Sequence, residues 1–448
     1  MVKQNTLSVL KGDTPRKPEQ QRNSLCLHRR LLLLGFFLLL GVRAATAQTP
    51  PPTEPTYLWP NAFSKANSDE WLRLHHDQIR QMKPRVLVLN FVNGLGEDEA
   101  KRKVEAVITA IRESSRYHAY QNSEAPAFLD YQVFKFVNLT DEVLPPEDQR
   151  MDGNSSLYPR PPDWKPGRIN FQYAELFKDK FTELYDVRNP DKASQKLSLE
   201  EMVNRGMVHE VWFLAAQGQF GAPLECTEAK QVYDTMLRKV AGKSAHAGVG
   251  AAEEQPFIGR SLRILHLNPD RGPGFAMEHL SGSLEALSTS KAIPYFTRYF
   301  TEYAGFDLDK RFRLPFDRLS NRSNGTEVSY PTPDSMAYQY KGENYTLKNY
   351  VAAGGSVRCP PNARRDFDID NRIPVLSTIE HFCLHDGLKD KDKAEPWTSE
   401  KFAGVRRAAP DGLGPWLVYW RQNMPGYGNK ALDGLGKPMK NWWPFLFY

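Results

Sequence analysis

Four short segments with the patterns of β-strands constrain the fold of this chain more than any other feature. Arg85–Phe91 is a continuous apolar run rich in valine and leucine, which is typical of a strand covered on both faces. Tyr131–Leu139 alternates between apolar and polar residues, as a strand with one covered face does. Val208–Ala215 and Leu262–Leu267 complete the set of predicted strands.

Helical patterns separate these predicted strands. Glu97–Arg116 is amphipathic, with acidic residues in its first turn and a basic end. Strands interleaved with helices imply right-handed crossovers and a mostly parallel sheet. We therefore expect an α/β domain over residues 84–305, with a mostly parallel sheet flanked by helices. The shorter predicted helices are Asp69–Gln81 with Ser68 as its cap, Leu199–Arg205 ended by Gly206, and Phe275–Ser288.

The pattern changes over residues 306–448. Periodicity is poor, turns are frequent, and aromatic residues crowd the last part, residues 411–448. Such a region forms either a small cap on the sheet domain or a wrap around it. We favour an irregular, aromatic-rich wrap, because so many aromatic side chains need apolar surface to pack against. Exposed aromatic platforms for sugar rings are the alternative use of these residues.

Residues 1–47 are predicted to be a signal peptide. The apolar run Leu31–Leu40 follows Arg29 and Arg30 and precedes Ala45-Thr46-Ala47, which is the order of charge, apolar core and small residues in a secretory signal. A membrane anchor is disfavoured, because a spanning helix needs about 20 apolar residues and the run Leu31–Leu40 is much shorter. Cleavage after Ala47 would leave a secreted or periplasmic protein without a membrane span. The paired arginines leave the ordinary and twin-arginine export routes open.

Residues 48–83 are predicted to be a proline-rich linker and a short helix.

The basic residues of the predicted signal peptide explain the net charge of +6. Residues 1–47 contain eight basic and two acidic residues, and subtracting them from totals of 59 and 53 leaves 51 of each sign. A neutral mature chain lacks the electrostatic footprint of nucleic-acid binding, so nucleic acid is excluded as a partner.

Three cysteines follow the predicted cleavage site: Cys226, Cys359 and Cys383. An oxidising compartment permits one disulfide and leaves one thiol. We prefer a bridge between Cys359 and Cys383, the pair closest in sequence.

The loops after the predicted strands supply candidate ligand-binding residues. In an open parallel sheet, ligands collect outside the carboxyl ends of the strands. Gly94-Leu95-Gly96 lacks the third glycine of a dinucleotide fingerprint, so we interpret it as a tight turn, with anion binding at the helix start as the alternative. The candidate ligand-binding residues at this edge are Asn93, Gln217, His266, Asn268, Asp270 and Arg271.

Acidic residues near the same edge are candidates for acid and base roles. Glu278 and Glu285 fall on one face of the predicted helix, with the small Gly282 between them, and Glu225 lies in the loop after the third strand. Such a carboxylate pair could act in acid/base catalysis. The alternative is a solvated acidic stripe, or one acid paired with Arg271.

Asp366, Asp368 and Asp370 form the densest acidic motif. In an extended chain these alternate residues share one side, where three carboxylates could bind a divalent cation. The favoured alternative is salt bridging with the neighbouring Arg364 and Arg365.

Motifs of nucleophilic hydrolases and zincins are missing. The sequence contains no G-x-S-x-G, and His209-Glu210 is not followed by a second zincin histidine. Cys383 lies between His381 and His385, which permits a thiol–imidazole pair or a metal clip, although a disulfide cysteine is favoured in an exported chain.

Several segments of the chain occur together in a known combination. They are Glu210–Phe213 followed by Phe220, Gly221 and Glu225, the helix from Glu278 to Glu285, Pro361–Asp368, Tyr419–Gly426 and Asn441–Phe445. This combination resembles an uncharacterised family of secreted bacterial proteins with no established activity. The resemblance spans most of residues 85–448 and implies one evolutionary unit. In that family a histidine often precedes the second helix acid by three residues, and here Gly282 takes that position, which puts a role for that imidazole in doubt.

These features lead to two functional hypotheses. The first is an exported protein that binds or hydrolyses a glycan-like extracellular ligand, with Glu225, Glu278 and Glu285 as acid and base. The second is a non-catalytic secreted binding or envelope-structural protein with the same fold.

Overall fold

A computed structural model describes residues 57–145, 151–152, 155–156, 172–216, 226–248, 255–385 and 392–448. The predicted signal peptide, the proline-rich stretch 48–56, Gln217 and Glu225 lie outside the described residues. Residues from Pro52 to Tyr448 belong to one compact unit. No helix in the described part of the chain has the length and apolar character of a membrane span.

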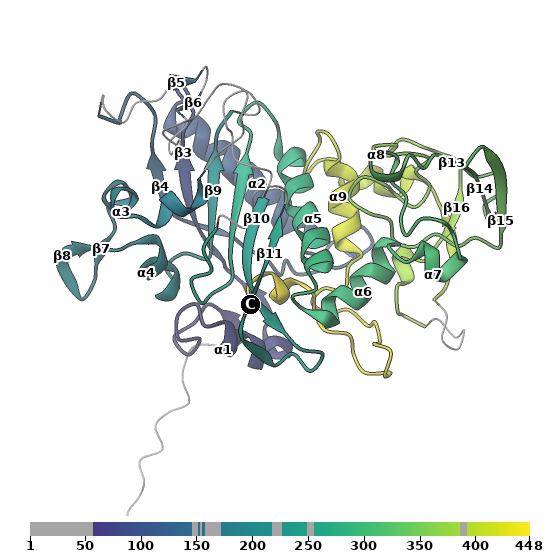
Figure 1. The fold of residues 1–448 in the computed structure, drawn as a ribbon, viewed down its shortest axis with the longest axis horizontal. Coiled ribbons are helices and arrows are strands. Elements are labelled where there is room, and N and C mark those ends of the chain that lie inside the picture. Colours follow the sequence, from purple (N-terminus) through teal and green to yellow (C-terminus); the bar gives the residue numbers. More distant parts are fainter. Residues whose placement is uncertain are drawn as a thin grey trace, which may run out of the picture. The chain divides into compact units, whose positions relative to one another are not determined.

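A six-stranded sheet forms the centre of this unit, with strand order β11-β10-β12-β9-β3-β4 (Figure 1). All four strands predicted from sequence are present, and adjacent members pair in parallel. They are β3 (Arg85–Asn90), β4 (Gln132–Asn138), β9 (Glu210–Leu214) and β12 (Leu262–Leu267). Their carboxyl ends therefore point to the same edge of the sheet.

The sheet is mixed, which corrects the expectation of a mostly parallel sheet. β10 (Cys226–Tyr233) pairs antiparallel with both β12 and β11 (Lys239–Gly248). The polar sequence of β10 concealed this hairpin. Its Glu228 and Lys230 are both buried, and they neutralise each other through a 2.7 Å contact between Lys230 Nζ and Glu228 Oε1.

Each face of the sheet packs against its own set of helices. α2 (Glu97–Ser114), α5 (Pro273–Ser290) and α9 (Gly414–Gln422) lie on one side of the sheet (Figure 1). Side chains such as Val88 and Trp212 share a core with these helices. The alternate side chains, among them Leu89 and Phe213, face the other core. That core also contains η2 (Tyr173–Phe177), α3 (Asp179–Tyr185) and α4 (Leu199–Asn204). Burial on both sides explains the apolar character of β3 and β9.

Three of the predicted helices are present with small differences at their ends, but the helix predicted over Asp69–Gln81 is α-helical only to Leu74, and Gln81 belongs to a strand. Ser68 caps α1 (Asp69–Leu74) by accepting a hydrogen bond from Trp71 N, and η1 (His76–Gln78) follows. Ser198 and Glu201 form a reciprocal capping box on α4, and Gly206 follows that helix with φ of +64°.

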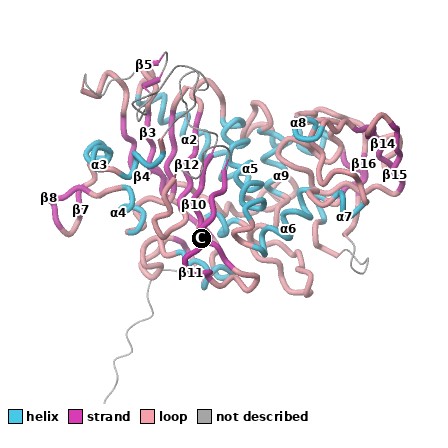
Figure 2. The backbone as a smooth tube through the Cα atoms, viewed as in Figure 1, coloured by secondary structure: helices cyan, strands magenta, loops and turns pink. Residues whose placement is uncertain are grey.

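The C-terminal region has many loops and short elements (Figure 2). Its aromatic residues belong largely to the core. α9 is buried along its whole length, and Trp442, Trp443 and Phe445 are buried as well. Phe447 packs against Tyr131 at 6.2 Å between ring centroids, and Tyr448 packs against Tyr233 at 5.4 Å.

The remaining helices and strands complete the described structure. The helices are α6 (Pro294–Ala304), α7 (Leu308–Phe312), α8 (Asn321–Asn324), η4 (Ile379–His381), η5 (Ser399–Val405) and η6 (Trp443–Leu446). The strands are β1 (Leu58–Trp59), β2 (Gln81–Met82), β5 (Met151–Asp152), β6 (Ser155–Ser156), β7 (Arg188–Asn189), β8 (Lys192–Lys196), β13 (Val328–Ser329), β14 (Ser335–Tyr340), β15 (Glu343–Lys348), β16 (Val375–Ser377) and β17 (Glu395–Trp397).

Cys359 and Cys383 are not bridged to each other, so the expected disulfide between them is not formed. Each thiol has its own surroundings. Cys359 Sγ lies 3.4 Å from Asp366 Oδ1, and burial raises the pKa of this thiol well above its usual value. The loop that carries Cys383 is held instead by Asp392, whose Oδ2 accepts a hydrogen bond from Cys383 N at 2.7 Å.

Candidate functional site

Polar side chains meet where β3 and β4 end. Asn90 Nδ2 donates to Asn138 Oδ1 at 2.8 Å. Asn93 donates to Asp141 Oδ2 and accepts from Asp141 N, both at 2.9 Å. The predicted ligand-binding residue Asn93 therefore lies at the expected edge, but both ends of its amide are engaged with Asp141.

A pocket of about 350 Å³ lies at the same edge, between the first half of α2 and the start of α5. Leu214 and Leu267, the last residues of β9 and β12, contribute to its lining, together with Val107 and Ala276. Its polar and aromatic lining comes from Glu99, Arg102, Lys103, Asn268, Arg271 and Phe275. We call it the strand-end pocket. Its position follows the rule that open α/β sheets bind ligands beyond the carboxyl ends of their strands.

The strand-end pocket carries an excess of positive charge. Lys103 pairs with Glu99 at 3.7 Å. The Arg271 guanidinium lies over the ring of Phe275, 5.7 Å from its centroid. Neither Arg102 nor Arg271 makes an ion pair with a described residue. Two uncompensated guanidinium groups beside apolar walls would attract an anion.

Asp411 occupies the N-terminus of α5 next to this pocket. Its Oδ1 accepts a hydrogen bond from Gly274 N at 2.7 Å, and its Oδ2 accepts from Phe275 N at 3.3 Å. The carboxylate already satisfies the positive end of the helix. An anion in the strand-end pocket would therefore be held by the arginine side chains rather than by the helix terminus.

Two buried histidines connect the strand ends below the pocket. His266 Nε2 contacts Ala215 O at 2.8 Å, and His279 Nδ1 contacts His266 O at 3.0 Å. Burial lowers the pKa of each imidazole to about 4, so both are neutral near pH 7. The predicted ligand-binding residue His266 does not line the pocket, and its imidazole instead ties the end of β12 to the end of β9.

Asn268 and Arg271 are the predicted ligand-binding residues that line the pocket. Asp270, also predicted, is exposed next to them, and its N–H donates to Asn268 Oδ1 at 2.9 Å. Arg102 and Lys103 were not among the ligand-binding residues predicted from the sequence. Their signal was a basic pair in the first half of a helix that follows a strand, but nothing in the sequence distinguished it from other charged pairs on that helix.

The predicted acids Glu278 and Glu285 both contact the loop after Ser356. Glu285 Oε1 accepts a hydrogen bond from Val357 N at 2.8 Å, and burial raises the pKa of this carboxyl to about 7. Glu278 Oε1 lies 3.6 Å from Arg358 Nε. Neither acid lines the strand-end pocket. The third predicted acid, Glu225, lies outside the described residues.

The aspartates predicted as cation ligands have separate partners. Asp366 accepts from Arg322 N at 3.1 Å. Asp368 binds Arg364 Nε at 2.7 Å and Nη2 at 3.0 Å. Burial opposes ionisation of Asp368, but these hydrogen bonds outweigh it and lower the carboxyl pKa.

Asp370 has a partner of its own, Arg406, at 3.6 Å. The arrangement matches the salt-bridging alternative for Asp368, and the structure does not gather the three aspartates into one ligand group.

Another group of potential metal ligands does come together. One ligand atom each from Glu380, His381 and Glu395 lies within 4.8 Å of the others. Both carboxylates already have cationic partners, because Lys401 Nζ lies 3.0 Å from Glu380 Oε2 and Lys393 pairs with Glu395. A metal would have to displace both lysines, so the geometry favours an ion-pair network. The sequence singled out His381, but not the two glutamates.

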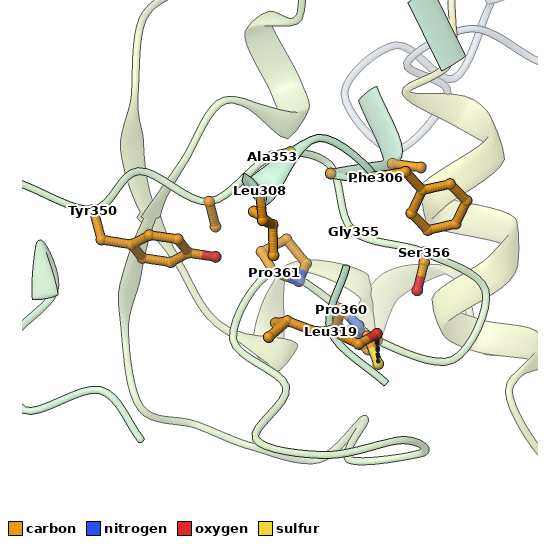
Figure 3. A pocket seen from close by; sticks show the side chains of 13 residues that line it. Phe306, Leu308, Leu319, Tyr350, Ala353, Gly355, Ser356, Pro360 and Pro361 are labelled. Atoms are coloured by element: carbon orange, nitrogen blue, oxygen red, sulfur yellow. Dashed lines mark hydrogen bonds between the residues drawn. The ribbon is translucent and has the colours of Figure 1, made fainter. Parts of the chain in front are cut away.

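A smaller pocket lies in the C-terminal region (Figure 3). It encloses about 20 Å³, which is room for about one water molecule. Figure 3 shows the Tyr350 ring directed toward Leu308 and Pro361, with Leu319 below them. The pocket is too small for an organic ligand.

Comparisons with protein-family models, curated proteins and solved structures gave no match. The resemblance to a secreted bacterial family therefore stays a prediction.

Proposed function

We propose that this protein binds a small organic anion with an apolar face in the strand-end pocket. One observation carries the proposal: Arg102 of α2 and Arg271 of the β12–α5 loop line the same apolar pocket, and neither has an ion-pair partner among the described residues. An arginine left without a counter-ion beside apolar surface gains most from a ligand that supplies one.

The shape of the lining defines the ligand class. The guanidinium groups match the planar, two-oxygen geometry of a carboxylate. Leu214, Leu267 and Phe275 offer apolar surface for the rest of the molecule. Acidic sugars and aliphatic or aromatic carboxylic acids share this chemistry. An acidic sugar would agree with the glycan-like ligand expected from the sequence.

Binding without hydrolysis fits this pocket better than catalysis. Glycosidases place two carboxyl groups about 5 to 10 Å apart around the scissile bond. Among the described residues, Glu99 is the one carboxylate that lines the strand-end pocket, and it is paired with Lys103. The catalytic roles of Glu225, Glu278 and Glu285 and the cation role of the three aspartates remain predictions.

We also propose that the protein acts outside the cytoplasm, as a secreted or periplasmic binding protein. Its support is the order of basic residues, apolar core and small residues in residues 1–47.

A ligand panel tests this function. The full-length protein would be screened by thermal shift against uronic acids and against aliphatic and aromatic carboxylates, each paired with its neutral amide. We expect acids to raise the melting temperature more than their amides, and the sugar and non-sugar arms to identify the source. Equal shifts from acids and amides, or no shift from any acid, would contradict the proposal.

A further inference from the structure

A second pocket, of about 740 Å³, lies at the other end of α2. It is lined by the second half of α2, by residues that follow that helix, and by η5 and its continuation. Its volume falls in the range of small-molecule sites. We call it the α2–η5 pocket. The lining residues that carry the argument are Arg112, Glu113, Arg116, Tyr120, Lys401 and Arg407.

The α2–η5 pocket is lined by four cationic side chains and one carboxylate. Arg116 Nη1 pairs with that carboxylate, Glu113 Oε2, at 2.7 Å. Arg407 is exposed and makes no ion pair with a described residue. The α2–η5 pocket therefore shares the main feature of the strand-end pocket, an arginine without a counter-ion.

The other two cations of the α2–η5 pocket pair with carboxylates that are more buried than they are. Arg112 Nη2 lies 2.6 Å from Asp130 Oδ1, and the Arg112 side chain is 45% exposed whereas that of Asp130 is 22% exposed. The Lys401 side chain is 36% exposed and that of its partner Glu380 is 8% exposed. Neither carboxylate lines the pocket. The pocket therefore presents the cationic member of each pair to solvent, which favours an anion.

The same two segments of the chain border both pockets. One is α2, because Ala106 lines the strand-end pocket and Thr109 lines the α2–η5 pocket three residues later. The other is the segment from Arg407, which lines the α2–η5 pocket, to Asp411, which accepts hydrogen bonds from the first turn of α5 beside the strand-end pocket. Four residues extend at most about 14 Å. One elongated ligand can therefore reach both pockets.

Cations are sparse along α2 between the two pockets. After Lys103 the helix carries no cation until Arg112, nine positions or about 14 Å further along its axis. Glu105, exposed on this stretch, adds a negative charge. A strand of nucleic acid carries one phosphate per about 3.4 Å, so several of its charges would lie here without a cation. A polysaccharide with carboxylates on only some of its units matches the wider spacing.

We infer that the anion bound in the strand-end pocket is one unit of an acidic polysaccharide, and that the same chain continues along α2 into the α2–η5 pocket. There the Arg407 guanidinium binds a second carboxylate, and the Tyr120 ring offers apolar surface for sugar C–H groups. This inference rests on the proposed function, because the strand-end pocket must hold the first carboxylate.

Two variants remove charge from the α2–η5 pocket and leave the strand-end pocket intact. Arg407→Gln removes the exposed arginine that has no ion pair. Arg112→Gln removes a cation whose partner Asp130 keeps Lys83 Nζ at 3.9 Å. Arg372→Gln, at an exposed position elsewhere, is the matched control. Circular dichroism checks that each variant is folded.

The measurement is a calorimetric titration of the full-length protein with galacturonic acid and with its oligomers up to the hexamer. We expect the wild type to bind the hexamer about tenfold or more tightly than the monomer, because one chain engages both pockets. Arg407→Gln and Arg112→Gln should each remove most of this gain and leave monomer binding unchanged. Arg372→Gln should keep the whole gain.

Two results would overturn this inference while the proposed function stands: a hexamer that binds no tighter than the monomer, or a gain that both pocket variants retain in full. The same holds if another acid of the ligand panel binds and no uronate does. If no acid binds at all, the proposed function fails as well.

Polyglutamate and a single-stranded DNA oligonucleotide of matched length are the other arms of the titration. We expect both to bind more weakly than the hexamer. If either one binds as tightly and loses affinity in the same two variants, the long ligand is a peptide or a nucleic acid and the polysaccharide inference is wrong.

Discussion

Asp411 and Gly274 lie in direct contact, because the Asp411 carboxylate accepts the Gly274 N–H at 2.7 Å in the first turn of α5. The contact joins the C-terminal region to the helix that borders the strand-end pocket. A side chain at position 274 would have no room, because a Cβ built there overlaps the carbonyl oxygen of Asp411.

Gly274→Ala should therefore destabilise the protein. We expect a loss of about 2 to 3 kcal/mol in the free energy of unfolding, since the backbone must shift to relieve the overlap. Gly282→Ala in the same helix is the control, because a Cβ there meets nothing within 4 Å. That variant should gain about 0.5 to 1 kcal/mol, because alanine is the better helix former. Urea denaturation measures both, and equal effects would show that the Asp411 contact is not tight.

We predict that replacing Glu285 with glutamine stabilises the protein, and that the size of this gain depends on pH. Burial raises the pKa of Glu285 from 4.5 to about 7, so the unfolded chain releases this proton at a lower pH than the folded protein does. The carboxyl therefore lowers stability as the pH rises from 4.5 to 7, by about 3 kcal/mol when fully ionised. Glu285→Gln keeps an acceptor for Val357 N and removes this cost.

The gain from Glu285→Gln should grow from about 1 kcal/mol near pH 5.5 to about 3 kcal/mol near pH 8. Urea denaturation at the two pH values checks it, with the exposed Glu343→Gln as control. A gain independent of pH would mean that Glu285 does not titrate in this range.

Because four histidines are buried, we predict that the folded protein loses stability in acid. Burial lowers the pKa of His76, His266 and His279 from 6.5 to about 4, and that of His209 to about 3. At pH values between 6.5 and these lowered pKa values, the four imidazoles are protonated in the unfolded chain but stay neutral in the folded protein. Their contribution to stability is therefore fully present above pH 6.5 and is lost as the pH falls, by about 2 kcal/mol for each histidine near pH 5.

The free energy of unfolding should thus drop by several kcal/mol between pH 7 and pH 5. His209→Asn should make the drop smaller, because the asparagine Oδ1 can still accept the Arg85 N–H that now donates to His209 Nδ1 at 2.9 Å. A control at the partly exposed His75 should leave the drop as it is. If the free energy of unfolding of His209→Asn falls between pH 7 and pH 5 by as much as that of the wild type, this account of the acid sensitivity is wrong.

The parallel part of the sheet could be predicted from the sequence, because strands that are buried on both faces consist mostly of apolar residues. Alternate residues of β3 and β9 enter two different cores, so both strands appear as apolar runs. β10 could not be recognised in this way, because its buried charges are stabilised by pairing, as Glu228 and Lys230 show. Hydropathy records the polarity of a residue, not the partner that compensates it.

The candidate site was predicted in part for a similar reason. Strand order places Asn268 and Arg271 at the edge where ligands collect, and both line the pocket. Arg102 could not be chosen, because its place in the pocket depends on how α2 packs beside α5. His266 sits at the predicted edge, but its imidazole bonds to Ala215 O below the pocket, a direction that the sequence does not specify.

The most direct test of the central claim is a calorimetric titration of the tightest carboxylate from the ligand panel into Arg102→Gln, Arg271→Gln and the double variant. The account predicts that each single change weakens binding by about tenfold or more, as the loss of a charged hydrogen bond does, and that the double change weakens it further. Arg372→Gln, which removes an exposed charge elsewhere, should bind as the wild type does. Wild-type affinity in the double variant would contradict the claim that these two arginines hold the ligand.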